Sequence, residues 1–461
     1  MAKTQQQASD VKINFLELVT PLETFDLTKV FMSMNIYENI YHNSMTLDIV
    51  LNDSINLPYY APILGEEYLN FEITTESIEA EDYVSLLPGP MYTVTITNRH
   101  ITNDRQQIYI LHCTSEQDVV NSNVTVSRSF RNKPISSIVE NILDNDLNSD
   151  NTYDIEDTKG IDTVIIPNWK PFEAINWLAK RAVNDNDAPN YLFWETIDFT
   201  HFRSIDSILA GDVKQKFVLN PVSEDAKKLN TTAEGWIELN SLEIKNQFNV
   251  TRNIETGYYA SKLITHDIVT KTITQKTSEL TEQFTDEISH TDKFMPISTT
   301  STYYELPDRV DFAPQANVKK DGKSLQEFHD SKIMFYPKHN RLYSGTEIEE
   351  YENNVEKWLL QRNHLILGLN QIKLVITFPG VSYLRAGDKV FIKVPSPERV
   401  QEQAPGKIKD PDKLTDKYLS GNYLITKLKH AIDQDTQKPT YTMIAEVVKD
   451  SLGDVPSHGE K

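Results

Sequence analysis

The chain has 461 residues, of which 39% are hydrophobic and 10% aromatic, and this composition supports folded cores and excludes a disordered protein. Its net charge of −21 argues against a positively charged nucleic-acid groove, and its single cysteine, Cys113, excludes an intrachain disulfide. No apolar run reaches the roughly 18–20 residues that cross a bilayer. We therefore expect no membrane anchor and no secretory signal.

Residues 12–116 are predicted to form a first antiparallel β-barrel. Apolar and polar residues alternate over 45–51, where Met45, Leu47, Ile49 and Leu51 share one face. A second alternating run follows Gly89, with threonines on its outer face, which is typical of a strand exposed on one side.

Residues 117–233 are predicted to form a separate α+β domain. Pro134 and Pro171 each precede an apolar stripe at helical spacing, so each is expected to open an amphipathic helix. The aromatic run at 191–194 favours a hairpin strand, and the polar stretch at 220–235 favours a linker.

A second antiparallel β-barrel is predicted from residues 234–277 and 368–450. The polar region 278–367 between them is interpreted as an insertion with a helix near 352–367. Residues 1–11 and 452–461 are expected to be flexible tails. The fold class is therefore α+β, mainly β, with two β-barrels in one chain, an intervening α+β domain and an insertion.

The two β regions share a pattern, which predicts an internal duplication. Each copy has a glycine, an acidic residue, a strand, a second glycine, a strand ending in a basic residue and His, and a third strand. The second copy has an extra Pro- and Lys-rich loop at 395–417. The first copy contains Gly65, Glu66, Glu67, Arg99, His100 and Tyr109, and the second contains Gly387, Asp388, Lys429, His430 and Tyr441.

The sequence predicts no catalytic, cofactor or metal site. It has no Gly-rich phosphate loop, no nucleophile elbow and no His-Glu-x-x-His helix. Glu66 and Glu67 are adjacent, so on a strand they face opposite sides, which disfavours a glycosidase acid–base pair. The aromatic residues at 59–60 and 191–194 are candidates for sugar binding, but core packing is favoured.

Eight segments, taken in order over about residues 12–452, resemble the central baseplate hub protein of contractile-tailed phages. This family is related to the N-terminal part of type VI secretion spike proteins. The segments are 35–40, 64–67, 163–175, 191–195, 378–380, 386–388, 419–426 and 448–451.

The resemblance implies a structural virion protein without catalysis. It implies a homotrimer with two tail-tube-like barrels per chain, so that six similar positions adapt a six-fold tail tube to a three-fold central spike. Baseplate wedge proteins would surround this hub, which would assemble in the host cytoplasm and become part of the virion tail. Gly65, Glu66, Glu67, Gly387 and Asp388 are the predicted interface residues.

DNA would pass through the ring without specific binding, and no cofactor is implied. Three chains carry 3 × −21, or −63, charges, which we expect to line a channel that repels DNA. Three alternatives stay open, namely a hub of a phage-derived injection machine, a tail-tip cell-wall hydrolase and a host-glycan-binding protein.

Overall fold

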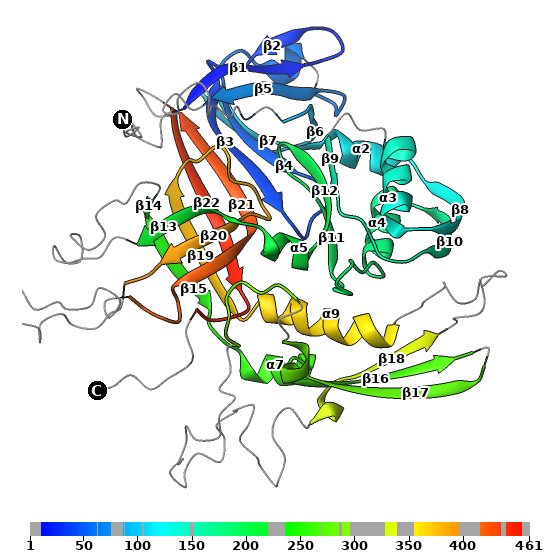
Figure 1. The fold of residues 1–461 in the computed structure, drawn as a ribbon. Helices are drawn as coiled ribbons and strands as arrows, with labels where there is room; N and C mark the ends of the chain where they lie inside the picture. The colour runs from blue at the N-terminus through cyan, green and yellow to red at the C-terminus, as the bar shows by residue number, and fades with distance from the viewer. Residues whose placement is uncertain are drawn as a thin grey trace, which may run out of the picture.

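The computed structural model describes residues 11–61, 63–74, 86, 88–103, 106–147, 152–219, 236–268, 270–284, 288–295, 328–338, 355–395, 415–434 and 439–453. The predicted linker 220–235, most of the 395–417 loop, and much of the 278–350 region and of both tails lie outside these ranges. The described residues form one 14-stranded sheet and three sheets of two or three strands, with fewer helices, which confirms the α+β, mainly β class (Figure 1).

The N-terminal part consists of strands and one short helix. Alternating apolar residues bury one face of most strands, as in β4, where Leu47, Ile49 and Leu51 are buried. The elements are β1 (Lys12–Val19), β2 (Thr24–Asp26), β3 (Phe31–Asn39), β4 (Thr46–Asp53), α1 (Leu57–Tyr60), β5 (Tyr68–Thr74), β6 (Met91–Asn103) and β7 (Gln106–Ser115).

The middle part mixes helices with two small sheets and has a core of its own. As predicted, Pro134 directly precedes α3 and Pro171 opens α4, and both helices bury an apolar face. The elements are α2 (Glu116–Asn123), β8 (Val126–Lys133), α3 (Ile135–Ile142), the π-helical turn η1 (Leu143–Leu147), β9 (Thr152–Ile155), β10 (Asp162–Trp169), α4 (Pro171–Ala179), β11 (Tyr191–Glu195), β12 (Phe199–Ser204) and α5 (Ile205–Ala210).

The C-terminal part is again built of strands, and its long hairpin β21–β22 lies beside β3 (Figure 1). β13 follows the middle part in the chain but pairs with β20, so it belongs to the large sheet. The elements are β13 (Val213–Leu219), β14 (Trp236–Leu239), β15 (Ser241–Asn246), β19 (Ile372–Pro379), β20 (Lys389–Lys393), β21 (Gly421–Gln434) and β22 (Pro439–Lys449).

The described residues between β15 and β19 in the sequence form a separate layer. Residues 260–277 were expected in the second barrel, but β16 and β17 pair with each other and with β18 in a sheet of their own, because α9 covers the apolar face of β16. The helix expected near 352–367 is α9. The elements are α7 (Val250–Thr256), β16 (Ala260–Asp267), β17 (Thr272–Glu279), α8 (Leu280–Gln283), η4 (His329–Ser331), β18 (Ile333–Lys338) and α9 (Val355–Leu369).

His364 on α9 is buried against this layer, and it makes stability depend on pH. Its Nδ1–H donates to the Tyr258 carbonyl at 2.7 Å, and its Nε2 lies 3.2 Å from the Ser278 hydroxyl. Burial lowers the pKa of His364 from 6.5 to about 4. Because the folded pKa lies below the unfolded one, this contribution is complete above pH 6.5 and is lost as the pH falls toward 4.

Lowering the pH from 7 to 5 is therefore expected to remove about 2 kcal/mol of stability through His364. Urea unfolding at the two pH values, followed by a probe in α9, measures this loss. His364→Gln should show a smaller difference between the two pH values than the natural chain. An equal difference in both proteins would contradict the assignment.

Eight strands form one continuous antiparallel sheet in the order β15-β19-β22-β21-β3-β4-β7-β6. Among the described residues, the strand order does not close either predicted barrel on itself. Instead, β3 of the N-terminal part pairs with β21 of the C-terminal part. The main core lies on one side of this sheet, where α5, β5, β13 and β20 cover it.

Candidate functional site

The two strand regions have the same hydrogen-bonded path. In the first unit, defined here as β3–β7, the order is β3-β4-β7-β6-β5, and in the second unit, β15 with β19–β22, it is β15-β19-β22-β21-β20. All these pairs are antiparallel, and a bulge interrupts β6 after Thr93 and β21 after Ile425. The predicted duplication is therefore visible as matching ladders, which allow residues of the two units to be equated rung by rung.

The acidic residues of the repeated pattern cap the loop before a strand. Glu67 is buried and accepts hydrogen bonds from the backbone N–H groups of Leu64 and Gly65 at 2.9 Å. Asp388 is also buried and accepts from the N–H of Arg385 at 2.8 Å. Each acid thus reaches three residues back, which equates Glu67 with Asp388 and Leu64 with Arg385.

The other predicted interface residues lie in the same two turns. Gly65 and Gly387 have φ values of 102° and 104°, a region that favours glycine, and a Cβ on Gly387 would lie 3.0 Å from the Trp194 ring. Glu66 is exposed, whereas Glu67 is occupied by its loop, so the two carboxylates do not face a common site. These observations give the turns a local structural role, and their place at an interface stays a prediction.

A cavity of about 400 Å³ lies beside the second turn, between the middle part and the second unit. Its lining includes Trp194, Gly387 and Asp388. Burial raises the pKa of Asp388, and Lys214, 2.6 Å away, partly offsets that effect. His201 and Asp154, which also line the cavity, are paired with each other at 2.9 Å. The charged groups in these pairs already have partners, so they do not form a free nucleophile and base.

A buried ionic cluster stabilises the contact between the two units. The Glu38 carboxylate accepts from the N–H of Ala386 at 2.8 Å and from that of Ile197 at 3.1 Å, and it lies 3.8 Å from Arg385 Nε. Arg385 also donates to Asp198 at 2.7 Å. Burial opposes the charge on Glu38, but His430 and Arg385 hold its pKa below the ordinary value.

The eight-stranded antiparallel path from β15 to β6 has a strand without a full partner at each end among the described residues. β15 pairs with β19 on one side only. β6 pairs with β5 only at Tyr92 and Met91, so the rest of that side of β6 is free. In the second unit, the corresponding side of β21 is filled by β3. An unpaired edge is a template for strand addition.

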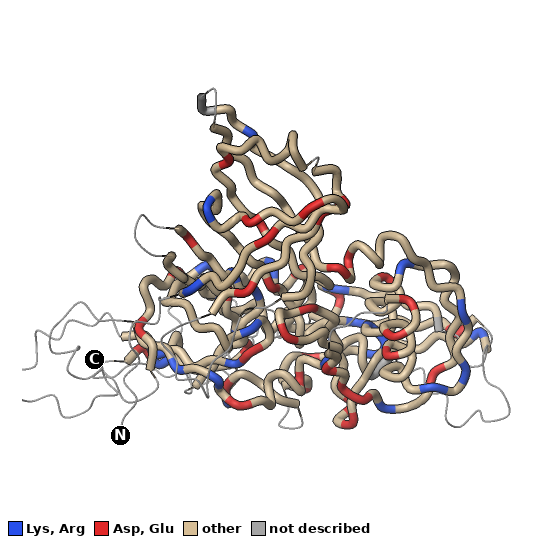
Figure 2. The backbone as a smooth tube through the Cα atoms, turned by 90° about the horizontal axis from the view of Figure 1, so that it is seen from above, with Lys and Arg blue, Asp and Glu red and all other residues tan. Residues whose placement is uncertain are grey.

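The face of the sheet away from the core is polar and carries both charge signs. On this face Lys427 Nζ of β21 lies 3.2 Å from the Glu446 carboxylate of β22, Lys429 lies over the ring of Tyr37 on β3, and Asp48 of β4 is paired with His112. A hollow of about 500 Å³ lies on this face where β3 meets β21. Figure 2 likewise shows acidic and basic residues interspersed along the chain. Negative charge is therefore not concentrated on this face, and the acidic channel lining stays a prediction.

Within the described ranges, no group of three or more His, Cys, Asp or Glu side chains is placed to hold a metal ion. No described helix is both long and apolar enough to span a membrane. All three aromatic residues at 191–194 are buried, with Trp194 Nε1–H donating to the Ala386 carbonyl at 3.1 Å, so they pack as core residues rather than as a sugar platform.

No protein-family model and no curated protein matches the sequence. Among solved structures, a tail protein from Neisseria meningitidis MC58 is similar over 95% of this chain and 96% of its own, with a TM-score of 0.50 and 7% identity. This chain has the fold of that tail protein.

Two further similarities are weaker. The 43 kDa tail protein of prophage MuSo2 from Shewanella oneidensis has a TM-score of 0.48 at 9% identity, covering 95% of this chain and 99% of that one. A component of the type VI secretion system of E. coli has a TM-score of 0.40 at 10% identity, covering 97% and 79%.

Proposed function

We propose that three copies of this chain form a ring that serves as a baseplate hub. The ring joins a six-fold tail tube to a three-fold central spike, with wedge proteins around it and DNA passing through it. The observation that carries the proposal is the pairing of β3 with β21, because it shows within one chain how one unit joins the next.

The free edges are the counterparts of this internal pair. β15 is the counterpart of β3, and β6 is the counterpart of β21. If β15 of one copy pairs with β6 of the next, each copy adds its eight strands in the same direction. Three copies then supply six units, and the contact is head-to-tail, so the eight-stranded paths of the three copies can join into one closed ring.

Exposure of equivalent residues supports this pairing. Ile432 on β21 is 0% exposed in the internal junction, whereas its counterpart Ile101 on β6 is 76% exposed. Ile36 on β3 is 0% exposed, whereas its counterpart Ile244 on β15 is 45% exposed. Apolar side chains that are covered inside the chain are thus left uncovered at its two edges, as expected for surfaces that pair between copies.

The polar face opposite the core is the candidate channel lining. The chain is acidic as a whole, but this face mixes lysines with carboxylates and is rich in threonine and asparagine. Neutral polar side chains with balanced charge give phosphates few fixed cations to bind, so DNA can slide without specific contacts. On this proposal the channel lining has mixed charge instead of the expected acidic charge.

A disulfide between copies tests the pairing. The ladders place Glu243 of β15 opposite His100 of β6, as Asn35 lies opposite Ala431 within the chain. The double variant E243C/H100C should therefore form a covalent trimer on oxidation, because directly opposed residues are within disulfide reach. Burial raises the pKa of Cys113 to about 12, so the natural thiol stays protonated and does not compete.

The matched control combines E243C with R131C, which lies on the exposed side of β8 in the middle part. It should remain monomeric on a non-reducing gel. Equal cross-linking of both pairs, or none in E243C/H100C, would contradict the proposed junction. The hub role predicts in addition that the trimer co-purifies with the tail-tube and spike proteins of the same particle.

A further inference from the structure

The two kinds of junction in such a ring differ in chemistry. We infer that the junction between copies is held by apolar contacts of Leu64 and Phe248, where the junction within the chain is held by the buried Glu38–Arg385 pair. The inference rests on the proposed ring and adds which side chains join one copy to the next.

Arg385 and Leu64 occupy equivalent positions in the two units. Both donate their backbone N–H to the buried acid three residues later, Asp388 or Glu67. Arg385 is 5% exposed because the internal junction covers it, whereas Leu64 is 82% exposed. A buried cation in one junction thus corresponds to an uncovered aliphatic side chain in the other.

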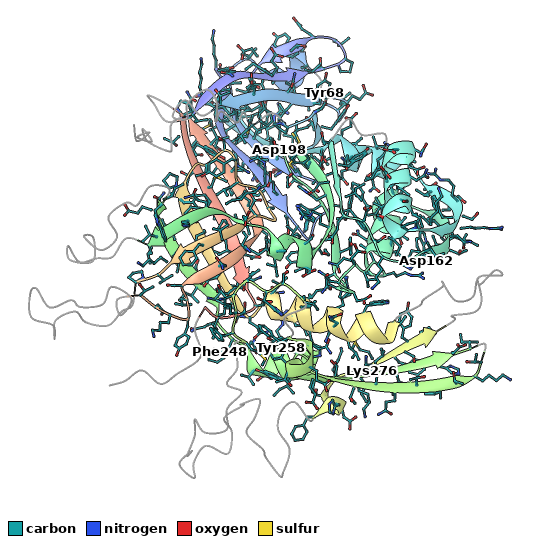
Figure 3. All side chains as sticks on the ribbon, in the orientation of Figure 1. Tyr68, Asp162, Asp198, Phe248, Tyr258 and Lys276 are labelled. Atoms are coloured by element: carbon teal, nitrogen blue, oxygen red, sulfur yellow. The ribbon has the colours of Figure 1, made fainter. Side chains whose placement is uncertain are left out.

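The strand end that this loop contacts also differs between the two junctions. Within the chain, the loop before β20 reaches Glu38 at the end of β3. The paired residues Tyr37–Thr46 and Asn246–Lys373 occupy equivalent positions in the two units. Gln247 and Phe248, which follow Asn246, therefore correspond to Glu38 and Asn39, which follow Tyr37. Phe248 is 70% exposed and lies between β15 and α7, far from the start of β5 at Tyr68 (Figure 3).

The copy-to-copy junction therefore has no counterpart of the Glu38–Arg385 charge pair at these positions. By this register Leu64 of one copy would lie at Gln247 of the next, beside Phe248, and the uncovered apolar area of Leu64 and Phe248 would leave water on assembly. Gln247 offers no carboxylate to a cation such as Arg385, and Leu64 offers no cation to a carboxylate such as Glu38. The two junctions therefore differ in polarity, with a buried charge pair within the chain and apolar side chains between copies.

The test measures trimer dissociation by light scattering over a dilution series. Leu64→Glu should raise the dissociation constant at least about a hundredfold, because it buries an uncompensated carboxylate. Leu22→Glu is the matched control, since Leu22 is 83% exposed but lies in the β1–β2 turn, and it should leave the constant unchanged. Both positions are exposed in the single chain, so neither variant disturbs its core.

A second pair of variants tests the placement itself. Leu64→Arg should weaken the trimer, and adding Gln247→Glu should restore part of the affinity by recreating the internal ion pair between copies. A natural chain that trimerises while Leu64→Glu has no effect would overturn this inference and leave the ring intact. A natural chain that never trimerises would instead overturn the proposed function.

Discussion

Glu38→Ala is expected to lower the free energy of unfolding by about 3–5 kcal/mol, the largest single effect we anticipate. The change leaves Arg385 buried with less compensation and removes the acceptor of two backbone N–H groups, those of Ala386 and Ile197. Urea unfolding monitored by tryptophan fluorescence measures the loss, and one of the five tryptophans, Trp194, donates to the Ala386 carbonyl beside this cluster.

Glu66→Ala is the control for this prediction, because Glu66 is an exposed glutamate whose loss should change stability by no more than about 0.5 kcal/mol. Equal effects of the two variants would show that the cluster does not hold the units together. Because the Glu38 pKa is depressed, its stabilising contribution is present above the unfolded pKa and is lost as the pH falls through the folded one.

Gly380→Ala is expected to cost about 3 kcal/mol through overpacking. Gly380 directly follows β19, and a Cβ there would overlap the ring of Tyr441, which is fully buried. The ring cannot move freely, since its hydroxyl lies 2.6 Å from His430 Nδ1. Thermal unfolding of the variant should show a clearly lowered midpoint.

Gly368→Ala provides the matched comparison, because a Cβ on this helical glycine would meet its neighbours at 3.6 Å, an ordinary contact. That substitution should be neutral or stabilise the helix by up to about 1 kcal/mol. Similar midpoints for the two variants would contradict the close packing assigned to the turn after β19.

Much of the local structure could be predicted from the sequence. Alternation of apolar residues located β4 and β6, and the prolines at 134 and 171 located the starts of α3 and α4, because both signals depend on residues close together in the chain. The glycine–acid pattern likewise marked two equivalent turns, at Glu67 and Asp388.

Long-range pairing could not be predicted in this way. Nothing local indicates that β3 pairs with β21, or that β16 and β17 leave the second unit for a sheet with β18. The bulges also shift the repeat, so that the rung of Tyr441 corresponds to Gln107 rather than to Tyr109. Alternation defines which face a residue takes, but not which strand lies beside it.

The central claim is that three copies close into one ring. The most direct measurement is the mass of the purified protein by light scattering over a range of concentrations. The account predicts about 159 kDa, three times the 52.9 kDa of one chain. A mass that stays at 52.9 kDa at every concentration, also after the spike protein is added, would contradict it.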